Sequence, residues 1–167
     1  MALNDESFQQ EAEQLLERLS EWLLAENRVL VSAESCTGGW IAQTATSRAG
    51  SSAWFDRAYI TYSNQAKQDM LGVSAQTLQR HGAVSEQTVS EMLAGALSGL
   101  QRKAVAVAVS GIAGPGGGSP AKPVGTVFIG WMTTGGQPRI QRFRFEGDRR
   151  LVRMQSVLEA LRGLTGE

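Results

Sequence analysis

The chain has 167 residues, of which 42% are hydrophobic, and we expect residues 1–167 to form a single domain with a substantial core. Sixteen basic residues balance sixteen acidic ones without a block of one sign, so the basic footprint of a nucleic-acid-binding protein is missing. One cysteine and one histidine exclude an internal disulfide and leave too few ligands for a zinc site. We therefore expect no metal and no cofactor, and a small-molecule substrate.

The apolar runs of the sequence argue against a membrane partner. The longest, around residues 104–109 and 127–132, fall well short of the roughly 20 residues that a membrane span needs. The N-terminal segment is acidic and amphipathic, which is not typical of a secretory signal. These features predict a cytoplasmic protein.

Helical and extended patterns alternate along the chain. Apolar residues at helical spacing predict a first helix over residues 8–23, with Asn4 and Asp5 placed to cap its start. Trp22 and Leu23 of this helix could pack on the chain's own sheet or on a neighbouring subunit, and we expect a homo-oligomer. The next predicted elements are a strand at 28–33, a helix at 37–48, a strand at 57–63, helices at 65–71, 74–80 and 85–100, and a strand at 103–109.

Residues 110–125 are rich in glycine and proline and predict a loop. Beyond it, residues 126–133 and 141–145 predict an antiparallel hairpin, and residues 148–162 a final helix. The alternation of helices and strands predicts an α/β fold, a three-layer α/β/α sandwich with a mixed, largely parallel sheet. Because ligands of such sheets collect beyond the carboxyl ends of the strands, we expect Ser35 and Ser110 to face one crevice.

The segment from Val29 to Trp40 runs from an apolar strand into hydroxylic residues and paired glycines, after which a helical pattern resumes. A helix start carries unpaired N–H groups and a positive potential, which makes Ser35 a candidate nucleophile. The G-x-S-x-G pattern of a nucleophile elbow is absent, and a plain helix cap formed by Ser35 or Thr37 is the structural alternative. Cys36 is a rival nucleophile, for which a buried, inert thiol is the alternative.

A serine nucleophile needs a base to take its proton. His81 lies at an expected helix end, where a structural role explains it, so a Ser-His-Asp triad is disfavoured. Lys67 follows a strand and could turn back into the crevice. As a base it needs a pKa lowered from about 10.4 to about 7.5, which we expect from partial burial against Tyr62 together with the nearby helix N-terminus. A solvated helix residue is the alternative for Lys67. Glu34 is a candidate acid or a group that orients Lys67.

Six motifs, in order along the chain, resemble the C-terminal domain of the competence-damage-inducible protein CinA. They begin at residues 33, 50, 62, 81, 110 and 122 and read AESCTGG, GSSAWF, YSNQAK, HGAVS, SGIAGP and KPVGTV. The likeness extends from about residue 11 to residue 161. Stand-alone members of this family are nicotinamide-nucleotide amidases, so the resemblance implies hydrolysis of nicotinamide mononucleotide to nicotinate mononucleotide and ammonia. This is a step of pyridine nucleotide salvage, and the resemblance implies no metal for it.

The resemblance also implies roles for individual residues. Ser35 would be the nucleophile, Lys67 its base, and Tyr62 a neighbour that shapes or protonates the site. Backbone N–H groups near residues 36–38 would stabilise the developing oxyanion. The residues implied in substrate binding are Cys36, Thr37, Gly38, Gly39, Ser110, Gly111, Ala113, Gly114, Thr126 and Arg149.

Two other functions remain open at this stage. The chain could be a catalytically silent relative that binds a nucleotide or a protein partner, since a fold does not guarantee an activity. It could also hydrolyse a different amide on a phosphorylated small molecule. Ammonia release from defined substrates separates the three possibilities.

Overall fold

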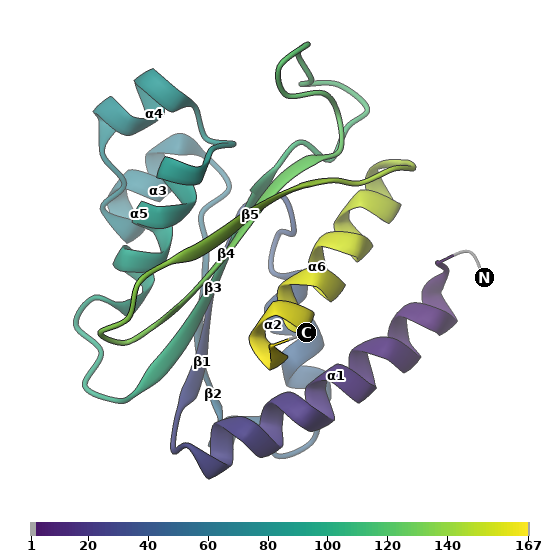
Figure 1. Cartoon of the computed structure of the whole chain (residues 1–167), viewed down its shortest axis with the longest axis vertical. Helices are drawn as coiled ribbons and strands as arrows, with labels where there is room; N and C mark the ends of the chain where they lie inside the picture. Colours follow the sequence, from purple (N-terminus) through teal and green to yellow (C-terminus); the bar gives the residue numbers. More distant parts are fainter. Residues whose placement is uncertain (1–2, 167) are drawn as a thin grey trace.

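The computed structural model of the chain describes residues 3–166, and its centre is a mixed sheet in the order β2-β1-β3-β4-β5 (Figure 1). The strands β2, β1 and β3 are parallel, whereas β4 and β5 continue the sheet as an antiparallel hairpin. The bounds of the strands are β1 Val29–Glu34, β2 Phe55–Ile60, β3 Ala104–Gly111, β4 Thr126–Thr133 and β5 Arg139–Arg144.

Helices cover both faces of this sheet, and the three-layer α/β/α prediction is confirmed (Figure 1). On one face lie α1, α2 and α6, and on the other α3, α4 and α5. Their bounds are α1 Asp5–Ala25, α2 Trp40–Ser47, α3 Asn64–Leu71, α4 Ala75–His81, α5 Glu86–Leu97 and α6 Arg149–Thr165. A short 3₁₀ turn at Ser51–Ala53 was not predicted.

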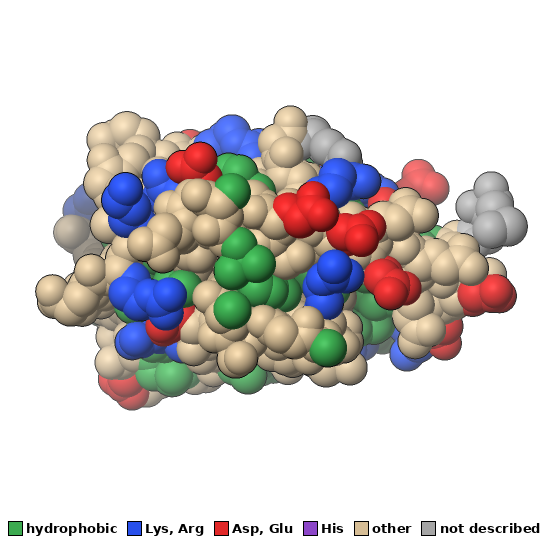
Figure 2. All heavy atoms as spheres, turned by 90° about the horizontal axis from the view of Figure 1, so that it is seen from below, with side chains coloured by type: hydrophobic (Ala, Val, Ile, Leu, Met, Phe, Trp, Pro, Cys, Tyr) green, Lys and Arg blue, Asp and Glu red, His purple; other side chains and the backbone are tan. Residues whose placement is uncertain are grey.

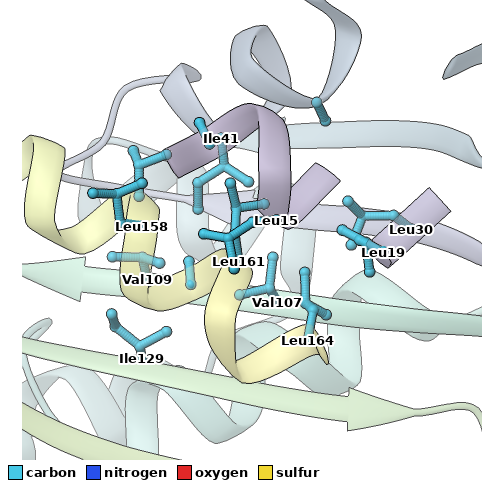
Figure 3. Close-up of a cluster of buried hydrophobic side chains, with 14 of the residues drawn as sticks. Leu15, Leu19, Leu30, Ile41, Val107, Val109, Ile129, Leu158, Leu161 and Leu164 are labelled. Atoms are coloured by element: carbon cyan, nitrogen blue, oxygen red, sulfur yellow. The ribbon is translucent and has the colours of Figure 1, made fainter. Parts of the chain in front are cut away.

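The larger apolar core lies between the sheet and the layer that contains α1 and α6. Leu15 of α1 meets Leu161 of α6 above Val107 of β3, and Leu19 of α1 lies beside Leu30 of β1 (Figure 3). These side chains are at most 2% exposed, and each aliphatic side chain buried in this way contributes about 1.5–3 kcal/mol. This packing fixes α6 over the sheet, which matters because the first turns of α6 reach the site described below.

The first helix packs within its own chain. Asn4 caps it as predicted, since its side chain accepts a hydrogen bond from the Ser7 N–H at 2.9 Å. Leu23 is fully buried in the larger core, and Trp22 packs against the same cluster. These two side chains therefore give no support to a subunit contact, and the homo-oligomer stays a prediction.

Two element boundaries differ from the sequence expectation near the end of the parallel strands. The helix expected from residue 37 begins at Trp40, and the strand expected to reach residue 63 ends at Ile60. After β2 the Ser63 side chain caps α3 by accepting from the Ala66 N–H at 3.0 Å. The chain thus turns back at residues 61–63, and this turn brings α3 over the end of the sheet.

The surface agrees with the balanced charge of the sequence. On the face drawn in Figure 2, acidic and basic side chains are interspersed with small hydrophobic areas. Within residues 3–166, no helix combines the length and the apolar character that crossing a membrane requires.

Candidate active site

The carboxyl ends of three parallel strands meet at one place. Glu34, the last residue of β1, pairs with Ile60 of β2 on one side and with Val109 of β3 on the other. The next residue, Ser35, donates its N–H to the Val109 carbonyl at 3.0 Å. Beyond β2, the Thr61 N–H donates to the Glu34 carbonyl at 2.9 Å. The crevice predicted beyond these strand ends therefore gathers residues from three separate segments.

Ser35 and Lys67 meet in this crevice. The Lys67 Nζ atom lies 2.9 Å from the Ser35 Oγ atom, a hydrogen-bond distance. Lys67 is 1% exposed and Ser35 is 8% exposed, so the pair is held out of bulk water. Lys67 projects from α3, the helix that starts at the turn after β2, and this turn is what aims the lysine back toward β1.

The hydrogen-bond acceptors around Lys67 could hold an ammonium, whereas its burial without a carboxylate partner favours the neutral amine. Its Nζ atom also donates to the carbonyls of Thr61 at 2.7 Å and Tyr62 at 3.4 Å, so an ammonium would have three acceptors. A neutral amine keeps two hydrogens for the carbonyls and turns its lone pair to the Ser35 hydroxyl. No carboxylate in residues 3–166 pairs with Lys67. Burial lowers the pKa of Lys67 to about 8, although the neighbouring Cys36 acts weakly in the opposite direction.

Tyr62 and Arg149 lie together on the pocket wall. An Arg149 N–H donates to the Tyr62 hydroxyl at 2.9 Å, and another donates to the Gly114 carbonyl at 2.8 Å. Arg149 can reach both because Asp148 caps α6 by accepting from the Leu151 N–H, which fixes the first turn of that helix. Tyr62 is 60% exposed, and the hydrogen bond that it accepts from Lys67 ends on its backbone carbonyl. The tyrosine ring therefore does not account for the shielding of Lys67 from water.

A pocket of about 210 Å³ contains the Ser35–Lys67 pair, and most of the predicted site residues line it. Besides that pair, the predicted residues on its wall are Cys36, Tyr62, Ser110, Gly111, Ala113 and Arg149. Ala83 and Val84 of the HGAVS motif also line it, and neither is a predicted site residue. Ser110 is held in place because its hydroxyl donates to the Ala83 carbonyl at 2.8 Å.

The remaining predicted residues are not among those that line this pocket. Gly38 and Gly39 have φ angles of +60° and +97°, a backbone shape that glycine adopts without strain. Gly114 supplies the carbonyl that receives Arg149. Thr126 is fully buried, and its hydroxyl donates to the Pro123 carbonyl at 2.6 Å. Thr37 is also fully buried, and its hydroxyl donates to Glu34 at 2.7 Å.

The Glu34 carboxylate organises the turn that carries Ser35. It is fully buried and accepts hydrogen bonds from the hydroxyls of Ser32 and Thr37 and from the N–H groups of Gly39, Ile41 and Ala42. The negative charge thereby caps α2, which has no side-chain cap of its own at Gly39. Neither Ser35 nor Thr37 caps this helix, and all the contacts of the Glu34 carboxylate lie within residues 32–42 rather than at Lys67.

The two rival candidates for the chemistry are placed unfavourably. Burial raises the pKa of the Cys36 thiol to about 12, so this residue stays protonated and is a poor nucleophile. His81 ends α4 on the surface, and its carbonyl accepts a hydrogen bond from Lys122 at 2.8 Å. His81 is not among the residues that line the pocket.

Arg153 is a site residue that the sequence reasoning missed. It extends from α6 to the carbonyls of Cys36 and Thr37, at 3.0 Å from each. The available signal was its spacing from Arg149, since residues four apart share one helix face. Nothing local in the sequence connects Arg153 to a turn 116 residues earlier.

A larger hollow of about 780 Å³ lies between α1 and α2, lined among others by Phe8, Trp40 and Arg150. Neither Ser35 nor Lys67 reaches it. Within residues 3–166, no group of three or more His, Cys, Asp and Glu side chains is arranged to hold a metal ion. The side chains that could carry out a reaction therefore lie in the smaller pocket, which contains Ser35 and Lys67.

The fold and the site define an α/β/α domain with a buried serine–lysine pair at the carboxyl ends of its parallel strands. The chain belongs to the CinA C-terminal domain family, whose profile matches residues 12–167. It is 51% identical over 151 residues to nicotinamide-nucleotide amidohydrolase PncC of Escherichia coli K12, which covers 90% of this chain and 91% of that protein.

Two further proteins agree with this assignment. The chain is 49% identical over 150 residues to nicotinamide-nucleotide amidohydrolase PncC of Pseudomonas putida, covering 90% of this chain and 92% of that one. The crystal structure of competence/damage inducible protein CihA from Agrobacterium tumefaciens superimposes with a TM-score of 0.88 at 41% identity. That match covers 99% of this chain and 98% of the other.

Proposed function

We propose that this chain, acting as one catalytic domain, hydrolyses the carboxamide of nicotinamide mononucleotide to nicotinate mononucleotide and ammonia. In this proposal Ser35 is the nucleophile and Lys67 is the general base. The names of the similar PncC proteins support the substrate. The observation that carries the mechanism is the 2.9 Å contact between Lys67 Nζ and Ser35 Oγ in a buried site.

The first half-reaction transfers the acyl group to the enzyme. Neutral Lys67 takes the proton of the Ser35 hydroxyl while Oγ attacks the amide carbon, and the carbonyl oxygen becomes an oxyanion. Lys67 then gives this proton to the amide nitrogen, and ammonia leaves as the C–N bond breaks. The result is a nicotinate ester on Ser35.

The second half-reaction returns the enzyme to its starting state. Lys67, neutral again, takes a proton from a water molecule that attacks the ester carbonyl. It passes the proton to the Ser35 oxygen as the ester bond breaks, which releases nicotinate mononucleotide. One amine thus serves both halves, and the chemistry that we propose needs no further side-chain base.

The turn after Ser35 offers groups for the oxyanion. In residues 3–166 the N–H groups of Cys36 and Thr37 donate to no other residue, whereas the Gly38 N–H already donates to the Ser35 carbonyl at 3.0 Å. Cys36 lines the pocket, whereas Thr37 is fully buried and does not. The Cys36 N–H is therefore the oxyanion donor in our proposal, which narrows the earlier expectation of residues 36–38. Donors of this kind stabilise the transition state rather than the bound substrate.

The size of the pocket suggests how the nucleotide lies. Its volume of about 210 Å³ is below the 300–1,000 Å³ typical of pockets for drug-sized ligands, so it suits the nicotinamide end alone. The ribose phosphate would extend past Tyr62 and Arg149 at the mouth. The Arg149 guanidinium is the group that we expect to bind the phosphate, since its planar fork matches phosphate oxygens.

The proposal is tested by ammonia release from nicotinamide mononucleotide. We expect steady release by the wild-type protein and a loss of at least about 10³-fold in kcat for Ser35→Ala and Lys67→Met, as for removal of catalytic nucleophiles and bases. Lys67→Arg is the matched control for charge, and we expect it to be equally inactive because a guanidinium stays protonated.

Other outcomes would select the alternatives. Binding of nicotinamide mononucleotide without ammonia release would favour a catalytically silent member of the family. Ammonia release from another phosphorylated amide, but not from nicotinamide mononucleotide, would favour a different substrate. Wild-type rates for Ser35→Ala would contradict the nucleophile.

A further inference from the structure

Arg153 is bonded to the turn that follows the nucleophile. Its Nε atom donates to the Cys36 carbonyl and one Nη atom donates to the Thr37 carbonyl, both at 3.0 Å. Its guanidinium carbon lies 5.2 Å from the centre of the Trp40 ring, at the start of α2. One side chain of α6 therefore holds two consecutive peptide groups, and it does so from the side opposite to their N–H groups.

The planarity of the peptide bond turns these contacts into a constraint on the N–H groups. The carbonyl and the N–H of one trans peptide point in opposite directions. The Cys36 carbonyl shares its peptide with the Thr37 N–H, so Arg153 directs that N–H away from α6. The Thr37 carbonyl shares its peptide with the Gly38 N–H, which Arg153 likewise directs away.

The constraint passes on to the residue after the nucleophile. The Gly38 N–H, once oriented, donates to the Ser35 carbonyl at 3.0 Å. That carbonyl shares its peptide with the Cys36 N–H, so this N–H is fixed as well. The Cys36 N–H, the oxyanion donor in our proposal, is thus set by a chain of contacts that begins at Arg153.

We propose that Arg153 is a positioning residue that holds the backbone N–H group of Cys36 toward the oxyanion formed when Ser35 attacks a carbonyl. This role rests on the proposed serine mechanism and deepens it. The guanidinium also polarises both peptides through their carbonyls, and hydrogen bonds in such chains strengthen one another. Arg153 need not touch the substrate, and it is not among the residues that line the pocket.

Arg150 provides a matched control on the same helix. Its guanidinium carbon lies 5.7 Å from the centre of the same Trp40 ring, and its side chain pairs with Asp5 of α1. Its hydrogen bond goes to α1 and not to the turn after Ser35. A loss seen in Arg153→Met but not in Arg150→Met therefore reports the contacts with the turn rather than the removal of a charge from α6.

The test combines two substrates with the variants Arg153→Met, Arg153→Lys and Arg150→Met. Ammonia release from nicotinamide mononucleotide measures the full reaction, and release of p-nitrophenolate from p-nitrophenyl acetate measures acetylation of Ser35 alone. For Arg153→Met we expect kcat and the acetylation rate each to fall about 10²-fold, as for loss of an oxyanion donor, with KM within about threefold of the wild type. Arg153→Lys should fall less, because an ammonium can bind one of the two carbonyls.

The remaining outcomes decide against the proposal or against its premise. Arg153→Met with near-wild-type kcat, a loss confined to KM, or an equal loss in Arg150→Met would overturn the positioning role. If the wild type acetylates Ser35 but releases no ammonia, the proposed function fails, and the acetylation rates of the variants still decide on Arg153. If Ser35→Ala releases p-nitrophenolate as fast as the wild type, Ser35 is not the nucleophile and both proposals fall. Should Arg153→Met not fold, an unchanged acetylation rate in Arg153→Lys would overturn the role.

Discussion

At the scale of single residues, the buried Glu34 carboxylate explains how a turn without regular structure can hold a nucleophile. It is fully buried, yet each of its oxygens has donors, from two hydroxyls and three backbone N–H groups. A buried carboxylate is tolerated when its hydrogen bonds are complete, and here they also cap α2. The geometry of Ser35 therefore depends on a residue that does no chemistry in our mechanism.

Glu34→Gln tests this dependence with almost no change of shape. The amide nitrogen would face an N–H donor at Ala42 or at Gly39 and Ile41, so at least one buried bond is lost. We expect the free energy of unfolding in urea to fall by about 1–3 kcal/mol, and kcat to fall with it. Glu91→Gln is the control, because Glu91 bonds to Ser74 and Thr77 in a more exposed place and should cost less than about 1 kcal/mol. Equal losses in the two variants would contradict this role of Glu34.

At the scale of elements, the position of Lys67 depends on how closely α3 approaches α5. Gly95 of α5 lies against the last turn of α3, and a Cβ atom placed on it would come within 2.0 Å of the Leu71 carbonyl oxygen. Real Cβ atoms do not approach so closely, so any side chain at residue 95 must push α3 away. Since α3 carries Lys67, this contact links α5 to the geometry of the dyad.

The variant Gly95→Ala distinguishes the effect of this close contact on stability from the effect of helix propensity. Propensity alone predicts a gain of about 1 kcal/mol from alanine, whereas overpacking costs about 1–3 kcal/mol. We expect a net loss of stability in thermal unfolding and a fall in kcat of at least about tenfold, because a displacement near 1 Å misaligns a base. The exposed neighbour Ala94 gives the control, since Ala94→Gly should lose about 1 kcal/mol with an unchanged kcat. A Gly95→Ala protein that is more stable and equally active would contradict this account of α3.

At the scale of the whole molecule, the sequence predicted those helices and strands that depend on local sequence pattern. Helical spacing and capping residues located α1 and α3–α6, and the continuously apolar run of β3 marked a strand that is covered on both faces. The start of α2 was wrong by three residues, because its first N–H groups are bound by Glu34 rather than by a local cap. Propensity carries no information about such a bond.

For the site, too, the residues marked by local sequence pattern were predicted and those placed by tertiary packing were not. Ser35 and Lys67 were predicted because each follows a strand, and the parallel register then brings these two residues together from 32 positions apart. Arg153 was missed because its contacts with the Ser35 turn exist only once α6 packs across the sheet. Long-range contacts of this kind come from the tertiary packing, and a single sequence does not contain them.

The dependence of activity on pH tests most directly whether a neutral lysine takes the proton of Ser35. Burial lowers the pKa of Lys67 to about 8, and the base is active only when it has lost its proton, so activity must rise with pH. We predict that kcat/KM for ammonia release from nicotinamide mononucleotide rises about tenfold between pH 7 and pH 9, with a midpoint near 8. A profile that is flat or falls over this range would contradict Lys67 as the base.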